Sequence, residues 1–80
     1  MKVRVIVSLK EGVLDPQGKA INHALHVLEF PEVCEVRTGK VIELDLDEEN
    51  PQRAAQRAHK MAESLLANQV IEDFIVEIAK

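Results

Sequence analysis

Hydrophobic and polar residues alternate near both ends of the chain. Within residues 2–9 every second side chain is aliphatic, and these side chains are Val3, Val5, Val7 and Leu9. Near the carboxyl end the same alternation returns at Phe74, Val76 and Ile78. A period of two in β-branched and aromatic residues is typical of a strand that buries one face. We therefore predict a first strand over residues 2–9 and a last strand over residues 73–78.

Two segments carry apolar residues at the three- and four-residue spacing of an amphipathic helix. Each begins with a capping residue followed by proline, at Asp15-Pro16 and at Asn50-Pro51, which is a favourable start for a helix. The first apolar stripe consists of Ala20, Ile21, Ala24, Leu25 and Leu28, and the second of Ala54, Ala55, Ala58, Met61, Ala62, Leu65 and Leu66. We predict a first helix that ends before Pro31 and a second helix whose alanines permit close approach to a sheet.

The segment 31–47 between these helices keeps one alternating phase on both sides of a glycine. Its apolar residues after the proline include the even-numbered set Cys34, Val36, Ile42, Leu44 and Leu46. A two-residue hairpin at Thr38-Gly39 would turn the later members of this set to the opposite face, so the phase counts against it. Two arrangements keep the phase: one long strand bent at Gly39, or two strands joined through an odd-length turn in which Gly39 takes a positive φ. We favour the long bent strand.

The order of elements is strand, helix, long strand or strand pair, helix, strand. No linker or low-complexity segment interrupts the 80 residues, and we assign residues 1–80 to one domain. The expected fold class is α+β, a two-layer sandwich with an antiparallel sheet, both helices on one face, and ferredoxin-like connectivity. Burial of apolar surface and loss of chain entropy nearly cancel in so small a chain. Because a single cysteine allows no internal disulfide, we expect the domain to be dimeric or a higher oligomer.

The composition argues against several classes of partner. Ten Lys and Arg against fourteen Asp and Glu give a formal net charge of -4, and the chain has no Trp or Tyr. Domains that bind nucleic acid normally have a basic surface or an aromatic stacking platform, so we expect no nucleic-acid partner. No apolar run approaches the length of a membrane-spanning helix, and the amino-terminal residues begin an alternating pattern instead of a signal peptide. We expect no membrane partner and a cytoplasmic location.

No group of residues forms a convincing catalytic or metal site. His23 and His26 lie three apart on the first predicted helix, but a third ligand is not apparent and His59 is on the other helix. Cys34 occupies an apolar position of the alternating segment, where a cysteine usually behaves as a small hydrophobic residue. Gly39-Lys40 lacks the upstream glycine and the following Ser or Thr of a phosphate-binding loop. We therefore expect no catalytic, cofactor-binding or metal-binding residue in this chain.

Two sequence runs resemble a known protein family. Residues 7–20 read VSLKEGVLDPQGKA, and residues 36–40 read VRTGK. Together they resemble the PurS family, the small subunit of phosphoribosylformylglycinamidine (FGAM) synthase, and the resemblance extends over nearly the whole chain. The combination of the two motifs is more specific than either motif alone. The chain departs from the family pattern at Glu29-Phe30-Pro31, where a Leu-Gly pair would close the helix.

The resemblance implies a non-catalytic subunit in de novo purine biosynthesis. In this family a synthetase subunit uses ATP and Mg²⁺ to convert formylglycinamide ribonucleotide (FGAR) to FGAM, and a glutaminase subunit releases ammonia from glutamine. The small subunit is thought to bridge them and to assist ammonia transfer within this ATP-dependent ligase. We expect no catalysis by the isolated chain and no cofactor bound to it. Its expected partners are a second copy of itself, the synthetase subunit and the glutaminase subunit.

The family-like residues outside the predicted core are our candidates for partner contact. They are Asp15, Pro16, Gln17, Gly18, Lys19, Arg37, Gly39 and Lys40. Loop residues of this kind frequently carry binding functions. The simpler interpretation is that Asp15 only caps a helix and that Arg37 and Lys40 only form a solvated bend. The alternative function is a stand-alone dimeric regulatory domain that binds a small metabolite.

Overall fold

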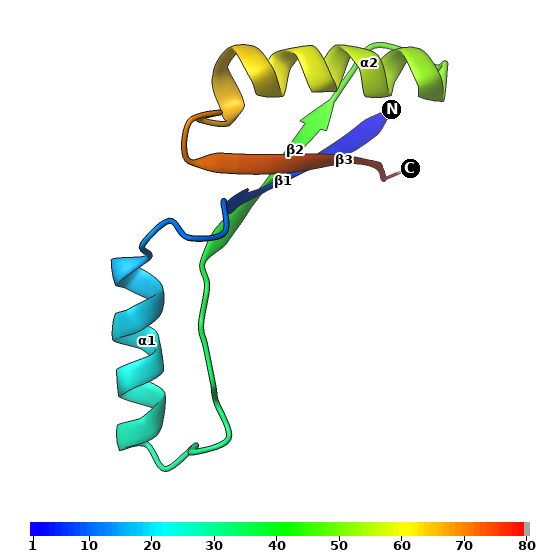
Figure 1. Ribbon diagram of the computed structural model, residues 1–80. Coiled ribbons are helices and arrows are strands. Elements are labelled where there is room, and N and C mark those ends of the chain that lie inside the picture. The colour runs from blue at the N-terminus through cyan, green and yellow to red at the C-terminus, as the bar shows by residue number, and fades with distance from the viewer. Residues whose placement is uncertain (80) are drawn as a thin grey trace.

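The protein contains three strands and two α-helices in the computed structural model, which describes residues 1–79 (Figure 1). The strands are β1 (Lys2–Leu9), β2 (Gly39–Asp45) and β3 (Glu72–Ile78). The helices are α1 (Pro16–Val27) and α2 (Pro51–Met61), and α2 continues into a π-helical turn, η1 (Ala62–Leu66). This order confirms the predicted α+β class. Within residues 1–79 no helix is long and apolar enough to cross a membrane.

β1 is the central strand of an antiparallel sheet in the order β2-β1-β3. Val5 on β1 lies opposite Ile42 on β2 and opposite Val76 on β3. The three alternating patterns are therefore in register, and the apolar residues of all three strands share one face. The outer edges of β2 and β3 have no strand partner within the described chain.

A row of alanines on α2 and at the start of η1 packs against this apolar face. Ala54, Ala58 and Ala62 are completely buried, as are Val3 and Val5 beneath them. A methyl side chain lets the helix axis approach the sheet closely, which confirms the predicted role of the alanines. The core is therefore small, and among residues 1–79 no fully buried side chain is larger than valine.

Both helices begin at the predicted caps. Asn50 Oδ1 accepts hydrogen bonds from the backbone N–H groups of Gln52 and Arg53, at 2.9 and 3.2 Å. Asp15 caps α1 in the same way through Gly18. These bonds satisfy N–H groups that have no carbonyl partner within the helix.

The position of α1 differs from the prediction. α2 alone covers the sheet, whereas α1 and the extended residues 31–38 form an arm that points away from it (Figure 1). The prediction placed both helices on one face because α1 carries an apolar stripe. That stripe indicates only that the helix buries one side, and in this chain neither the sheet nor α2 covers it: its members Ile21 and Leu28 are exposed.

The long middle segment runs through Gly39 without reversing, as the favoured prediction required. Only its second half, β2, is a strand, so the predicted long strand is shorter than expected. Pro31 and Glu32 form a turn, and the extended residues 33–38 have no strand partner in the described chain (Figure 1). Gly39 does not have the positive φ that the alternative two-strand arrangement required. It is needed for space, because a Cβ at this position would lie 2.7 Å from the carbonyl oxygen of Val7.

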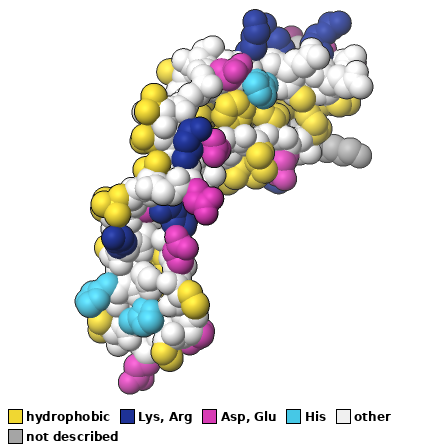
Figure 2. All heavy atoms as spheres, viewed as in Figure 1, with side chains coloured by type: hydrophobic (Ala, Val, Ile, Leu, Met, Phe, Trp, Pro, Cys, Tyr) yellow, Lys and Arg dark blue, Asp and Glu magenta, His cyan; other side chains and the backbone are white. Residues whose placement is uncertain are grey.

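The arm makes the protein extended and rich in exposed surface. The radius of gyration is 15.9 Å, whereas roughly 12 Å is expected for a compact chain of this length. The accessible surface is 6057 Å², against about 4,900 Å² for a typical monomer of this mass. Figure 2 shows hydrophobic side chains exposed along the arm. These dimensions are those of a chain that completes its packing with another molecule.

Candidate functional site

Asp15 is the centre of the site at the base of the arm, which we define as residues 10–19 together with residues 36–40. The side chain of Asp15 is buried, with 4% of the residue exposed. Its Oδ1 accepts a hydrogen bond from Gly18 N–H at 2.8 Å, and its Oδ2 accepts bonds from the N–H and the hydroxyl of Thr38 at 2.7 and 2.9 Å. One carboxylate therefore fastens the start of α1 to the residue that precedes β2. The sequence predicted that Asp15 caps α1, which the bond from Gly18 confirms. It contained no local signal for the bonds from Thr38.

These hydrogen bonds lower the pKa of Asp15 below its ordinary value of 3.8. The largest cause is the bond from the backbone N–H of Thr38, followed by the bond from Gly18, and the nearby Arg37 guanidinium adds to them. All three favour the ionised carboxylate, and they outweigh the opposing effect of burial. We call the hydrogen bonds from Gly18 and Thr38 to Asp15 the Asp15 clamp. The clamp therefore depends on the charged carboxylate of Asp15.

We predict that this clamp weakens in acid. The folded pKa lies below 3.8, so the stabilisation is complete above about pH 5 and is lost as the pH falls through the folded value. Asp15→Asn removes the charge at every pH. The unfolding temperature of wild type should exceed that of Asp15→Asn at neutral pH, and the difference should narrow as the pH approaches about 3.

Asp47→Asn is the matched control, because Asp47 is exposed and lies outside the base of the arm. Its difference from wild type should change little over the same pH range. A difference between wild type and Asp15→Asn that stays constant with pH would contradict the assignment of the clamp to the ionised carboxylate.

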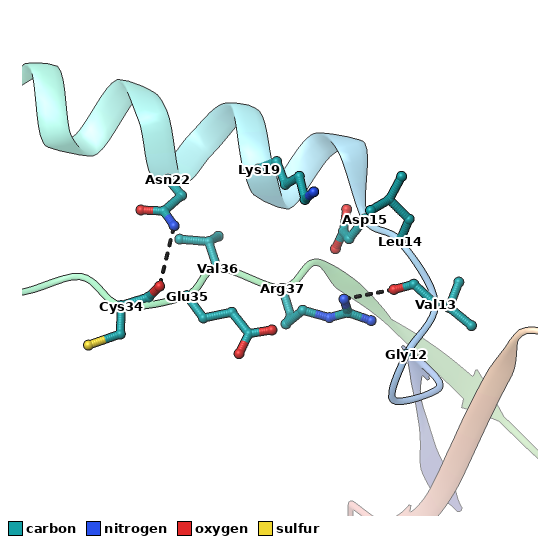
Figure 3. Close-up of a pocket in the computed structure, with 10 residues that line it drawn as sticks. All are labelled: Gly12, Val13, Leu14, Asp15, Lys19, Asn22, Cys34, Glu35, Val36 and Arg37. Atoms are coloured by element: carbon teal, nitrogen blue, oxygen red, sulfur yellow. Dashed lines mark hydrogen bonds between the residues drawn. The ribbon is translucent and has the colours of Figure 1, made fainter.

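Arg37 fastens the other side of the base. Its guanidinium donates hydrogen bonds to the carbonyl oxygens of Val13 and Lys10, at 2.8 and 3.2 Å, and Figure 3 shows the bond to Val13. Both acceptors belong to the loop that leaves β1. The prediction treated Arg37 as a partner-contact residue; in the structure it is a brace of the loop whose side chain still reaches the surface.

Gly18 sets the distance between α1 and the extended segment. A Cβ at this position would collide with the carbonyl oxygen of Val36, so only glycine lets the two backbones approach this closely. Further along the arm, the ring N–H of His26 donates to the carbonyl of Val33 at 2.8 Å. α1 and residues 31–38 are thus held together as one unit from base to tip.

The structure brings the two predicted groups of partner-contact residues together, although about twenty residues separate them in the sequence. A pocket of about 420 Å³ lies between the loop after β1, α1 and the extended segment (Figure 3). It is lined by Gly12, Val13, Leu14, Asp15, Lys19, Asn22, Cys34, Glu35, Val36 and Arg37. A second hollow nearby is shared by Gln17, Gly39 and Lys40. Pro16, Gln17, Lys19 and Lys40 are exposed, whereas Asp15 and Gly18 are buried and position them.

The candidate residues for metal or thiol chemistry lie apart. His23 and His26 are on α1, while His59 is on α2, where it contacts Glu63 at 3.3 Å and the ring of Phe74. Cys34 is exposed on the arm. Among the described residues no three His, Cys, Asp or Glu side chains are grouped as metal ligands. What the base of the arm presents is a braced, charged surface.

Known proteins resemble this chain over its full length. A family model described as PurS: Phosphoribosylformylglycinamidine (FGAM) synthase matches residues 2–80. The chain is 51% identical over 77 residues to the phosphoribosylformylglycinamidine synthase subunit PurS of Bacillus subtilis, covering 96% of this chain and 90% of the relative. It is 40% identical over 79 residues to the subunit of the same name from Methanocaldococcus jannaschii, covering 99% of this chain and 95% of the relative.

Solved structures share its fold as well as its sequence. The crystal structure of Methanocaldococcus jannaschii PurS superimposes with a TM-score of 0.89 at 42% identity, covering 99% of this chain and 95% of that one. A chain in the structure of PurLQS from Thermotoga maritima superimposes with a TM-score of 0.86 at 33% identity, covering 95% and 93% of the two chains. The extended arrangement described above is therefore shared with experimentally determined relatives.

Proposed function

This chain belongs to the PurS family of FGAM synthase subunits, and we propose that it acts as the non-catalytic small subunit of that enzyme in de novo purine biosynthesis. The observation that carries the proposal is the full-length similarity to PurS subunits, together with the likeness to a chain of PurLQS. The residues described above support a structural role, because they brace a surface. We place the complex in the cytoplasm as part of this proposal.

The first partner in the proposal is a second copy of the chain. The accessible surface exceeds that of a typical monomer by about 1,200 Å², whereas a standard stable interface buries about 800 Å² per partner. Much of the exposed apolar surface is on the arm, including Val27, Leu28 and Phe30. The area available on each copy is therefore sufficient for a stable dimer.

We place the arm of one copy against β2 and α2 of the other. α2 leaves a hollow of about 550 Å³ beside β2, lined by Leu44, Arg57, Lys60, Met61, Ser64, Leu65 and Leu66. The outer edge of β2 is unpaired, and the extended residues 33–38 have no strand partner in the described chain, so the backbone groups of residues 35–37 can pair with that edge. A helix seated beside α2 would restore the two-helix layer that the sequence predicted.

The charges of the two surfaces favour this arrangement. The hollow is bordered by Arg57 and Lys60, whereas the tip of the arm carries Glu29 and Glu32. Opposite charges at the rim of an interface improve its specificity and association rate. If each copy placed its arm in the hollow of the other, the same contact would form twice and would bury the apolar surfaces of both copies.

The dimer would then bridge the synthetase and glutaminase subunits. We propose that the exposed residues at the base of the arm, Pro16, Gln17, Lys19 and Lys40, contact these partners. Asp15, Gly18, Arg37 and Gly39 hold that surface in shape through the contacts described above. ATP and Mg²⁺ would be used by the synthetase subunit, and this chain would assist the transfer of ammonia.

Omission of the chain from a reconstituted enzyme tests this proposal. We expect glutamine-driven FGAM formation to fall by at least about tenfold, which corresponds to about 1.4 kcal/mol of activation free energy. Turnover with free ammonium salts should change far less, because ammonia from solution does not depend on the bridge. Both rates are measured with the same synthetase preparation, with and without this chain.

Equal losses in the two reactions would contradict a role in ammonia transfer, and no loss in either would contradict the subunit role. In the second case the alternative of a metabolite-binding regulatory domain would be favoured. It has the pocket of about 420 Å³ at the base of the arm as a candidate site.

A further inference from the structure

α1 ends in a closure that favours glycine but contains a glutamate. The backbone N–H of Phe30 donates to the carbonyl oxygen of Leu25 at 3.0 Å, and that of Glu29 donates to the carbonyl oxygen of His26 at 3.1 Å. This pair of bonds places Glu29 in the left-handed region, with a φ of 72°. Glycine usually occupies such a position, because a Cβ is strained there. The side chain of Glu29 therefore carries a local steric cost.

The charge of Glu29 adds a second cost. A helix is electrically negative at its carboxyl end, so a carboxylate is disfavoured there. Glu29 is exposed directly after the last residues of α1, and the ion pairs found among residues 1–79 do not include it. Strained residues that persist in a fold cluster at sites of binding. A cation on another molecule would compensate for what the described chain leaves unpaired.

The arm exchange proposed above determines where the tip of the arm lies. The extended residues 33–38 continue into β2, so pairing each half with the other half of a second copy makes the two long segments antiparallel. Residues 33–38 are about 20 Å long and β2 is about 23 Å long. Because the two halves meet at Gly39, the tip of one arm reaches the far end of β2 in the other copy, near Asp45 and Leu46.

A hollow with a basic wall lies at this end of β2. Its volume is about 260 Å³, and it is lined by Leu46, Asp47, Glu48, Arg53, Arg57 and Met61. Arg53 pairs with Glu48 at 3.4 Å, whereas the ion pairs within the described part of the chain do not include Arg57. Figure 2 shows Lys and Arg side chains gathered over α2. Arg57 also lines the larger hollow beside β2, so an arm seated there passes close to it.

We propose that Glu29 is the residue by which one copy recognises another, through an ion pair between its carboxylate and the guanidinium of Arg57 in the second copy. The inference rests on the arm exchange of the proposed function and assigns its specificity to one pair. The guanidinium neutralises the carboxylate, and a cation at the carboxyl end of α1 also favours the helix. Because the exchange is mutual, the pair forms twice in each dimer.

Reversal of both charges tests the pair directly. Glu29→Arg alone and Arg57→Glu alone each bring like charges together, and each should raise the dissociation constant of the dimer by about tenfold or more. The double variant restores opposite charges and should return the constant to within about threefold of wild type. Sedimentation over a dilution series at low salt concentration measures the constant.

Glu77→Arg is the matched control for the charge reversal. Glu77 is exposed on β3, at the opposite edge of the sheet from β2, so this variant should change the dissociation constant by less than about twofold. Glu29→Gly distinguishes recognition from a purely structural role, because glycine removes the strain together with the charge. We expect the Glu29→Gly dimer to be weaker by about threefold or more, whereas a purely structural role predicts a dimer at least as tight as wild type.

Four results would overturn the inference, and they can be told apart. Single reversals that leave the dimer unchanged would show that Glu29 and Arg57 lie outside the contact. Single reversals that weaken the dimer, without recovery in the double variant, would show that the two residues contact other groups. A Glu29→Arg protein that dimerises normally but binds the synthetase or glutaminase subunit less tightly would assign Glu29 to that subunit. If wild type is monomeric, the arm exchange itself fails, and this inference fails with it.

Discussion

Gly18→Ala is expected to break the dimer that the arm exchange creates. The added methyl group has no free volume, because it would meet the carbonyl oxygen of Val36 and would also lie 3.0 Å from the carboxyl carbon of Asp15. Neither neighbour can easily move away. The Val36 oxygen is a backbone atom, and the Asp15 carboxylate is held by the hydrogen bonds that Thr38 donates to it. α1 must therefore move away from residues 31–38, and the base of the arm must open.

Helix propensity alone would predict that Gly18→Ala stabilises α1, whereas the steric clash predicts a loss of stability. Alanine within a helix is favoured over glycine by about 0.5–1 kcal/mol, whereas forcing atoms into filled space typically costs about 1–3 kcal/mol. The difference is a net loss of about 1 kcal/mol in each arm, which would raise the dissociation constant of a dimer with two exchanged arms by roughly tenfold to a hundredfold. Sedimentation over a dilution series measures this constant.

Gln17→Ala provides the comparison, since Gln17 is the exposed neighbour of Gly18 in the same turn of α1. It should leave the dissociation constant unchanged within about twofold, as surface substitutions usually do. Circular dichroism of the Gly18→Ala protein should still show the sheet and α2, because the added methyl group would meet Val36 and Asp15, which lie outside the sheet and α2. A Gly18→Ala protein that dimerises as tightly as Gln17→Ala would show that the close contact with Val36 is not required.

The sequence predicted features that depend on residues close together in the chain. It did not predict contacts between residues far apart in the chain. The cap at Asn50 and the alternation around Val5 are local, because the partner groups are within a few residues or share one strand. The bonds that Thr38 donates to Asp15 join residues 23 apart, and nothing in the sequence specifies that pairing. The sequence could therefore nominate the residues at the base of the arm, whereas the roles of Asp15 and Arg37 as braces required the structure.

The position of α1 shows a second kind of limit. An apolar stripe states that a helix will be buried on one side, but it does not state by which molecule. In a two-layer fold formed by one chain, the sheet of the same chain would bury the stripe of α1, as the sequence analysis predicted. The continuous path through Gly39 removes this option, because a segment that does not turn back carries α1 beyond the end of the sheet (Figure 1).

Ala58→Leu is expected to lower the stability of the fold by a large fraction of its total. Ala58 is completely buried between its neighbours on α2 and the valines of β1. Leucine adds three carbon atoms where the helix lies directly on the sheet, so α2 must lift or β1 must shift. Overpacking of this kind costs about 1–3 kcal/mol, from a total that for about 80 residues is roughly 4–12 kcal/mol.

The unfolding temperature measures this loss directly. For a domain of this size each kcal/mol lowers it by about 4–8 °C, so a decrease of roughly 10 °C or more is expected for Ala58→Leu. Gln56→Leu places the same side chain on an exposed position of the same helix and should stay within about 0.5 kcal/mol of wild type. Equal unfolding temperatures for the two variants would mean that α2 does not rest on the sheet as closely as its alanines allow. α2 also forms one wall of the hollow beside β2, so a helix displaced from the sheet should weaken dimerisation as well as stability. A decrease in stability without weaker dimerisation would show that the partner's arm does not bind in this hollow.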